Sequence, residues 1–171
     1  MSFSELVDKR CSVRGFSQKG VERNKILQIL HAARRAPSAC NNQPWIFIVC
    51  YKEETRKNPA AVYDWEWFVN APAIIAVCFD KSVSWKRGDG KEYGEVDAAI
   101  AMDHITLQAA EMGLGTCWIG AFNADKAKRV LRLPAGVEPV PFTPLGYPQV
   151  ASKKKARKPL EEIVHWEFFE G

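Results

Sequence analysis

The sequence predicts an α+β fold in which helices flank a central sheet. Two continuous apolar runs, residues 45–51 and 73–79, are bounded by residues that break regular structure, which is typical of buried strands. Apolar residues recur at helical spacing along 21–36 and 95–112. The chain has 171 residues, 47% of them hydrophobic, so we expect one domain, 1–171, with a sizeable core.

The N-terminal residues predict a short helix that leads into a basic segment. Ser2 and Glu5 have the spacing of a capping box, in which each side chain binds the backbone N–H of the other residue. The second helix, over 21–36, buries one face. That face carries Ile26, Ile29, Leu30 and Ala33. The helix must end at Pro37, because proline clashes with the preceding turn.

Residues 37–44 form a predicted loop between this helix and the first strand. Its polar side chains are Ser38, Asn41, Asn42 and Gln43. Each of them brings hydrogen-bonding groups that must be paired if they are buried. The loop suits the polar edge of a ligand, and an ordinary tight turn accounts for the same residues equally well.

The two strands are both expected to be central in the sheet and buried on both faces. Between them, residues 53–70 are predicted to be helical. Their aromatic side chains are Tyr63, Trp65, Trp67 and Phe68. Aromatic residues in such a stretch are more often core than part of a cofactor site. Residues 80–94 contain glycine and charged residues that indicate a mobile loop.

The helix over 95–112 is apolar on most of its surface. Four of its polar side chains fall along one narrow stripe: Asp97, His104, Gln108 and Glu111. A helix of this type is buried on most sides, either at the centre of the domain or by a partner subunit.

Shorter elements are predicted beyond this helix. Two glycines permit a close turn into a strand over 116–120, and Asn123 can cap the helix that follows. Residues 137–147 have an extended pattern, and their prolines confine them to an edge strand or a bulged strand. The tail 161–169 is so apolar that it must dock on another surface.

Composition excludes several classes of protein. Five cysteines without a Cys-x-x-Cys pair predict reduced, mostly buried thiols, and three histidines without metal-type spacing predict no metal site. No apolar run can span a bilayer and the N-terminal residues do not resemble a signal peptide, so we expect a cytoplasmic protein. The net charge is +4, and five cations lie within residues 153–158. These cations suit a solvated surface, a phosphate or a nucleic acid, but no nucleic-acid-reading motif accompanies them.

Four segments in one order resemble the FMN-dependent nitroreductase family, and the resemblance covers nearly the whole chain. They are Arg10–Arg14, residues 34–51 with the Pro-Ser-Ala-Cys-Asn-Asn-Gln-Pro-Trp sequence, Gly113–Gly120, and Lys155–Leu160. The resemblance implies a three-layer α/β/α fold around a mostly antiparallel sheet. It also implies a homodimer in which each C-terminal arm embraces the other subunit.

The same resemblance implies an FMN site with no catalytic side chain. The implied cofactor-binding residues are Arg10, Cys11, Ser12, Arg14, Pro37, Ser38, Ala39, Asn41, Trp118, Ile119, Gly120, Lys155 and Arg157. The cationic members would hold the phosphate and the ribityl chain, and the Gly120 N–H would point at flavin N5. Residues 37–41 would reach the flavin bound mainly by the other subunit.

The implied function is a ping-pong transfer of hydride from NAD(P)H onto flavin N5 and then to an acceptor such as a nitroaromatic or a quinone. One alternative is a flavin-handling protein that fragments, senses or stores FMN or removes halogens. A more remote alternative is a basic nucleic-acid-binding module that uses residues 153–158.

Overall fold

A computed structural model describes residues 1–149 and 156–169. Its helices are α1 (Phe3–Lys9), α2 (Arg23–Ala33), α3 (Glu53–Ala60), α4 (Glu66–Val69), α5 (Gly94–Glu111) and α6 (Ala124–Leu131), with 3-10 turns η1 (Ala39–Asn41) and η2 (Leu160–Glu162). Its strands are β1 (Trp45–Cys50), β2 (Ala73–Asp80), β3 (Gly115–Thr116) and β4 (Val137–Gly146).

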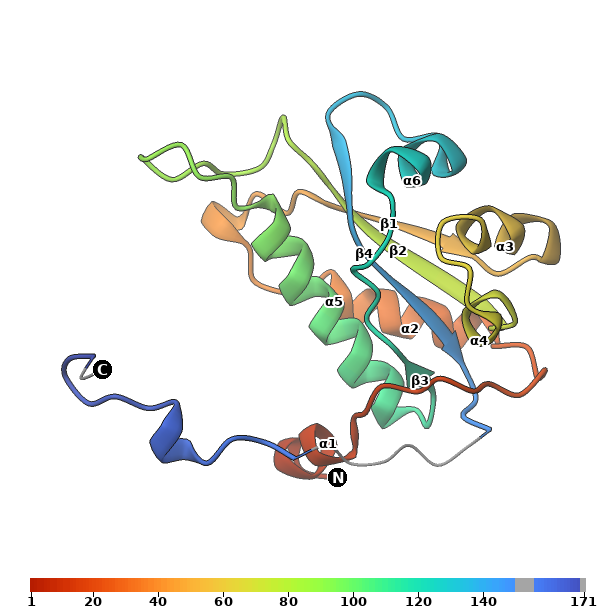
Figure 1. The fold of residues 1–171 in the computed structure, drawn as a ribbon, viewed down its shortest axis with the longest axis horizontal. Coiled ribbons are helices and arrows are strands. Elements are labelled where there is room, and N and C mark those ends of the chain that lie inside the picture. Colours follow the sequence, from red (N-terminus) through yellow and green to blue (C-terminus); the bar gives the residue numbers. More distant parts are fainter. Residues whose placement is uncertain (150–155, 170–171) are drawn as a thin grey trace.

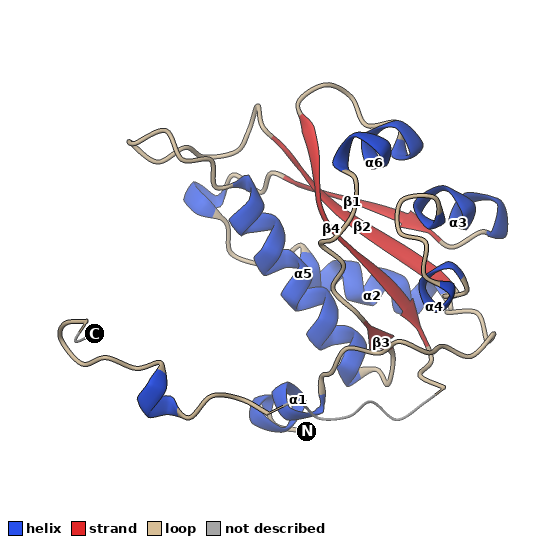
Figure 2. Ribbon diagram, viewed as in Figure 1, coloured by secondary structure: helices blue, strands red, loops and turns tan. Residues whose placement is uncertain are grey.

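The strands form one sheet between two layers of helices, as Figures 1 and 2 show. The strand order is β1-β2-β4-β3, and all three pairings are antiparallel. Helices α2 and α5 cover one face, whereas α3, α4 and α6 cover the other. The predicted α+β fold with a mostly antiparallel sheet in a three-layer arrangement is therefore confirmed.

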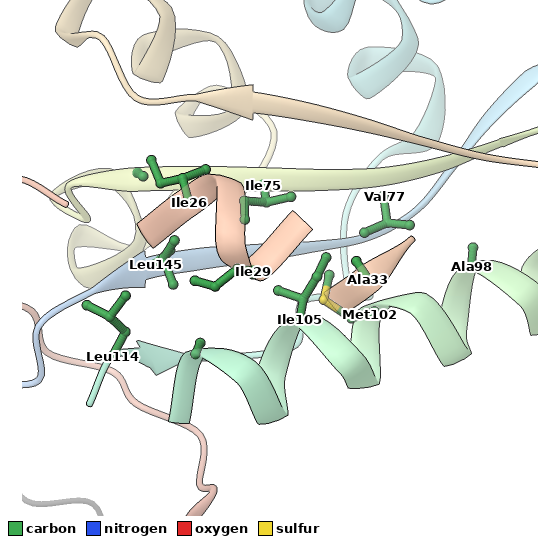
Figure 3. Close-up of a cluster of buried hydrophobic side chains, with 12 residues drawn as sticks. Ile26, Ile29, Ala33, Ile75, Val77, Ala98, Met102, Ile105, Leu114 and Leu145 are labelled. Carbon is green, nitrogen blue, oxygen red and sulfur yellow. The ribbon is translucent and has the colours of Figure 1, made fainter. Parts of the chain in front are cut away.

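Strand β2 lies at the centre of both cores because alternate side chains point to opposite faces of a sheet. Ile75 and Val77 pack with Ile29 of α2 and Met102 of α5, as Figure 3 shows. The residues between them, such as Ile74, lie in the core on the other face. The prediction of a strand buried on both faces holds for β2.

Strand β1 is an edge strand, which corrects the prediction that both strands are central. Among the described residues it pairs with β2 alone, and most of its side chains are half-buried or exposed. Its side chains still pack on both faces, with Phe47 and Val49 against one core and Ile48 against the other, and a strand covered on both faces gives a continuous apolar run whether it lies at the centre or at the edge of the sheet. The run at 45–51 therefore did not contain the information needed to place it.

Residues 53–70 form two short helices separated by a turn, where the sequence predicted continuous helix. The N–H groups of Val62 and Tyr63 both donate to the Pro59 carbonyl and close the end of α3. After this turn Phe68 is fully buried, whereas Trp65 keeps 59% of its surface exposed. The predicted assignment of these aromatics to the core is right for Phe68 and wrong for Trp65.

The proline-rich strand β4 is bulged, as predicted. Its register against β2 shifts between Ala76 and Cys78. On its other side β3 pairs with it only at Leu145 and Gly146. The predicted strand over 116–120 is correspondingly short, because regular pairing ends at Thr116.

Gly94 at the start of α5 is required by packing. It is buried, and a Cβ atom added to it would overlap the Phe79 ring of β2. We expect Gly94→Ala to lower the free energy of unfolding by about 1–3 kcal/mol, the usual cost of overpacking a core. Gly88→Ala is the matched control, since an added Cβ there meets nothing within 4 Å. Equal urea midpoints for the two variants would contradict this prediction.

Candidate functional site

The first basic segment begins where α1 ends. The predicted capping box fixes the start of this helix: the Glu5 N–H donates to Ser2 Oγ at 3.2 Å, and the Ser2 N–H donates to the Glu5 carboxylate at 2.6 Å. Arg10 follows Lys9 with an extended backbone and so ends the helix. The residues after Arg10 are therefore free to run alongside the sheet.

This segment adds to the edge of the sheet next to β3. The Val13 N–H donates to the Thr116 carbonyl at 2.8 Å, and Ser12 forms a parallel bridge with Thr116. Gly115 permits the close approach, because a Cβ atom there would lie 2.7 Å from the Val13 side chain. The structure thereby brings the first motif, residues 10–14, together with the third motif, residues 113–120.

The arginines of the first motif carry no carboxylate partner among the described residues. Arg10 is half-buried and Arg14 is exposed. The guanidinium carbon of Arg14 lies 5.8 Å from the centre of the Trp67 ring. Unpaired guanidinium groups beside a serine hydroxyl suit a phosphate dianion, which binds best to bidentate cationic donors.

Two backbone pairings fix the third motif beyond β3. The Cys117 N–H donates to Thr143 Oγ1 at 3.1 Å. Ile119 exchanges two hydrogen bonds with Phe142, at 2.8 and 3.0 Å, and its side chain lies in the core. Ile119 therefore positions the segment, while the side chain of Trp118, 44% exposed, and the backbone of Gly120 remain accessible.

Gly120 is a glycine that the chain's own packing does not require. A Cβ atom at this position would meet only Trp118 Nε1, at 3.8 Å, which is an ordinary contact. Its φ angle is also outside the left-handed region that favours glycine. Close approach of a ligand to the backbone is a physical reason for glycine here. The unpaired cations and this open glycine fit FMN.

The loop after α2 has a tight, strained conformation. The Gln43 N–H donates to Ser38 Oγ at 3.0 Å and closes the loop on itself. Cys40, Asn41 and Gln43 all have positive φ angles, of 52°, 55° and 51°. Such angles are rare outside glycine and mark segments held in place by their surroundings.

Two further contacts hold this loop, one with α5 near its start and one with the segment that follows β2. The Ala39 N–H donates to Asp97 Oδ1 at 3.0 Å, and Asn42 Nδ2 donates to the Val83 carbonyl at 2.9 Å. Asn41 is exposed, and its side-chain amide makes no hydrogen bond with another described residue. The polar groups of the loop are thus divided between internal bonds and an exposed amide edge.

The two halves of the predicted site lie at opposite ends of α5 within one chain. Residues 37–41 adjoin Asp97 in its first turns, whereas residues 10–14 pair with the strand that follows Glu111 (Figure 1). At 1.5 Å per residue, Asp97 and Glu111 are separated by about 21 Å along the helix. One chain therefore does not bring the two groups together.

The fourth motif is only partly visible. Lys155 lies outside the described residues. Arg157 is exposed on a C-terminal segment that extends away from the body of the domain, and its Nη1 donates to the Ala156 carbonyl at 3.4 Å (Figure 1). The remaining predicted residues are Cys11, half-buried against Val13, and Pro37, exposed at the end of α2.

Asp97 has a structural role that its place on a polar stripe did not reveal. Its exposed fraction is 2%, and Oδ2 has no hydrogen-bond partner among the described residues. Burial raises the pKa of this carboxyl above its usual range, and the hydrogen bond from the Ala39 N–H lowers it in part. The sequence signal that could have indicated this role is an acidic residue in the first turn of a long apolar helix.

Asp97→Asn should stabilise the protein at neutral pH and not at acid pH. A raised folded-state pKa means that the folded chain binds more protons than the unfolded chain, so stability falls as pH rises through that interval. Asparagine keeps an acceptor for the Ala39 N–H and removes the charge. The amide Nδ2 takes the place of the unpartnered Oδ2, so only the cost of the buried charge is removed, and we expect a gain below the roughly 1–3 kcal/mol that an unsatisfied buried polar group costs. Urea unfolding from pH 4 to 8 measures it, and a loss at every pH would contradict the account.

The described residues contain neither a metal-binding cluster nor a membrane-spanning helix. Among residues 1–149 and 156–169, no group of three or more His, Cys, Asp or Glu side chains is placed to hold a metal ion. Within the same part of the chain, no helix is both long enough and apolar enough to cross a membrane. Cys50, Cys78 and Cys117 are buried, as predicted for most of the cysteines, whereas Cys40 is exposed.

Comparison with known proteins gives consistent matches over nearly the whole chain. The profile described as the nitroreductase family matches residues 7–67 and 60–147. The NAD(P)H FMN reductase of Bacillus subtilis (strain 168) is 30% identical over 181 residues, covering 96% of this chain and 72% of that protein. Iodotyrosine deiodinase 1 of Sus scrofa is 30% identical over 196 residues, covering 95% and 67%. A nitroreductase family protein of Clostridium difficile 630, known from its crystal structure, matches with a TM-score of 0.88 and 38% identity, over 99% of this chain and 100% of that one.

Proposed function

The chain belongs to the nitroreductase family, and we propose that it transfers hydride from NAD(P)H to an acceptor such as a nitroaromatic or a quinone. It is an NAD(P)H-dependent oxidoreductase with FMN as its cofactor. When bound, FMN supplies the group that accepts and returns hydride, at N5 of its ring. The polypeptide binds and orients the cofactor and the substrates and stabilises charge on the reduced flavin, so no catalytic side chain is needed.

The pairing of the first motif with the third supports this proposal most directly. The Val13–Thr116 hydrogen bond ties the segment that carries the cations of residues 10–14 to the start of the segment that leads to the exposed Gly120. We infer that Arg10 and Ser12 bind the phosphate together with Lys155 and Arg157. We infer that the Gly120 N–H donates to N5 and that the Arg14 guanidinium faces the pyrimidine edge of the ring, where the reduced form carries negative charge.

The second half of each site comes, in this proposal, from a second copy of the chain. Residues 37–41 sit at the far end of α5 from residues 10–14, so they can complete a site only across a dimer interface. The exposed Asn41 amide would then contact the flavin of the partner subunit. The tail after Arg157, with exposed fractions of 83% for Trp166 and 78% for Phe168, supplies apolar surface that a partner would cover.

Steady-state kinetics test the order of the reaction. Initial rates should be measured with NADH or NADPH varied at several fixed concentrations of a quinone or a nitroaromatic, with protein freed of FMN as the control. One exposed site that takes the donor and the acceptor in turn predicts parallel double-reciprocal lines. Intersecting lines would mean that both substrates bind together, which would contradict the ping-pong order.

Reductive removal of halogen is a second candidate function. It is supported by the 30% sequence identity with a deiodinase, in an alignment that covers 95% of this chain. It would use the same FMN site with a halogenated aromatic as the acceptor. Halide release from 3-iodotyrosine under anaerobic conditions, compared with nitroaromatic reduction by the same preparation, distinguishes the two candidates.

A further inference from the structure

Arg14 rests against an aromatic ring and not against a carboxylate. Its guanidinium carbon lies 5.8 Å from the centre of the Trp67 ring, a cation–π distance, and no described acidic side chain forms an ion pair with it. Arg14 is otherwise exposed, and no other described residue forms a hydrogen bond with its side chain. Trp67 is therefore the neighbour that restricts where this cation can lie.

The Trp67 ring itself contacts two other aromatic rings. It meets Tyr63 edge-on at 5.9 Å and Phe68 edge-on at 6.3 Å between ring centres. Phe68 is fully buried, and Trp67 also packs against the cluster that contains Val13. The ring is thus fixed to the same segment that carries Arg14, and it presents a rigid face to the guanidinium.

An aromatic face positions a cation without cancelling its charge. A carboxylate at this place would form an ion pair with Arg14 and offset its field, whereas a π face attracts the guanidinium through a quadrupole and leaves the net charge at +1. A cation that is held but not neutralised suits a place where negative charge develops during a reaction.

We propose that Trp67 is a positioning residue that holds Arg14 against the flavin and thereby raises the reduction potential of bound FMN. The inference rests on the proposed function and deepens it. A flavin bound here would take two electrons and one proton as hydride from NAD(P)H, and its reduced form would carry negative charge on the pyrimidine side. A fixed Arg14 stabilises that charge, and the oxidised neutral ring gains nothing comparable.

The midpoint potential of bound FMN tests this inference. It is measured anaerobically against a reference dye with dithionite as reductant, in wild type, Trp67→Leu and Trp67→Phe. We expect a more negative potential in the leucine variant, by about 30 mV for each tenfold loss of preference for the reduced form. Phenylalanine keeps a π face, so the potential of Trp67→Phe should lie close to that of wild type. Trp67→Met replaces the leucine variant if the latter does not fold.

A double-mutant cycle with Arg14→Met separates positioning from general packing. If Trp67 acts through Arg14, Trp67→Leu should produce no further shift in the Arg14→Met background. Trp65→Leu is the matched control, since Trp65 is exposed and belongs to the same aromatic cluster through Tyr63. It should leave the potential unchanged.

Two results would overturn the inference alone: an unchanged potential in Trp67→Leu, or the same shift with and without Arg14. A wild-type chain that binds no FMN would overturn the proposed function itself, and the inference with it. FMN binding therefore separates failure of the proposed function from failure of the role of Trp67.

Discussion

Arg10→Ala should weaken FMN binding by about 1.5–3 kcal/mol, the range for a hydrogen bond to a charged group. This corresponds to a dissociation constant about 10- to 150-fold higher. The side chain is half-buried beside the β3 edge and has no carboxylate partner among the described residues, so its removal should leave the fold intact. Quenching of flavin fluorescence on titration with protein freed of FMN gives both dissociation constants.

Arg23→Ala is the control for net charge in this experiment. Arg23 lies at the exposed start of α2 and also lacks an ion pair among the described residues. Loss of one positive charge there should leave FMN affinity within about twofold of wild type, a difference below 0.5 kcal/mol. Equal affinities for Arg10→Ala and wild type would remove Arg10 from the proposed site.

Removal of residues 161–171 should convert the proposed dimer to monomer and lower FMN affinity with it. Trp166, Phe168 and Phe169 are 83%, 78% and 79% exposed in the single chain. Burial of one such side chain contributes about 1.5–3 kcal/mol, so the three together contribute several kcal/mol to association, less the cost of ordering the arm. We expect the dimer dissociation constant to rise at least about a thousandfold.

Sedimentation of the truncated chain across a range of concentrations measures this effect. The matched control replaces Glu161 and Glu162 by alanine, because both are exposed on the same segment and end in a carboxylate where Trp166 and Phe168 present an aromatic ring. That variant should remain dimeric. A truncated chain that stays dimeric and binds FMN as tightly as wild type would contradict the exchange of arms.

The elements that the sequence predicted well are those whose signals are local. The capping box at Ser2 and the cap at Asn123, whose Oδ1 accepts the Lys126 N–H at 2.8 Å, each need only neighbouring residues. Strand β2 is similar, because burial on both faces produces a continuous apolar run. The first and third motifs were also found by their own residues, and the structure pairs them.

Features that depend on distant partners could not be predicted in this way. The edge position of β1 depends on its pairing with β2, which is distant in the sequence. The burial of Asp97 depends on the loop that contains Ala39, whose N–H donates to the Asp97 carboxylate. The sequence predicted that Trp67 is a core residue. Its contact with Arg14 could not be predicted, because the two residues lie 53 positions apart (67 − 14). The separation of residues 37–41 from residues 10–14 is likewise a property of the fold and not of either motif.

The visible absorption spectrum of the purified protein, recorded without oxygen before and after addition of NADH or NADPH, tests the central claim most directly. It requires no assumption about the acceptor. The account predicts a bound flavin spectrum, in the protein as purified or after reconstitution with FMN, that bleaches with one or both nucleotides. A bound flavin that neither nucleotide bleaches, or a protein that holds no flavin after reconstitution, would contradict it.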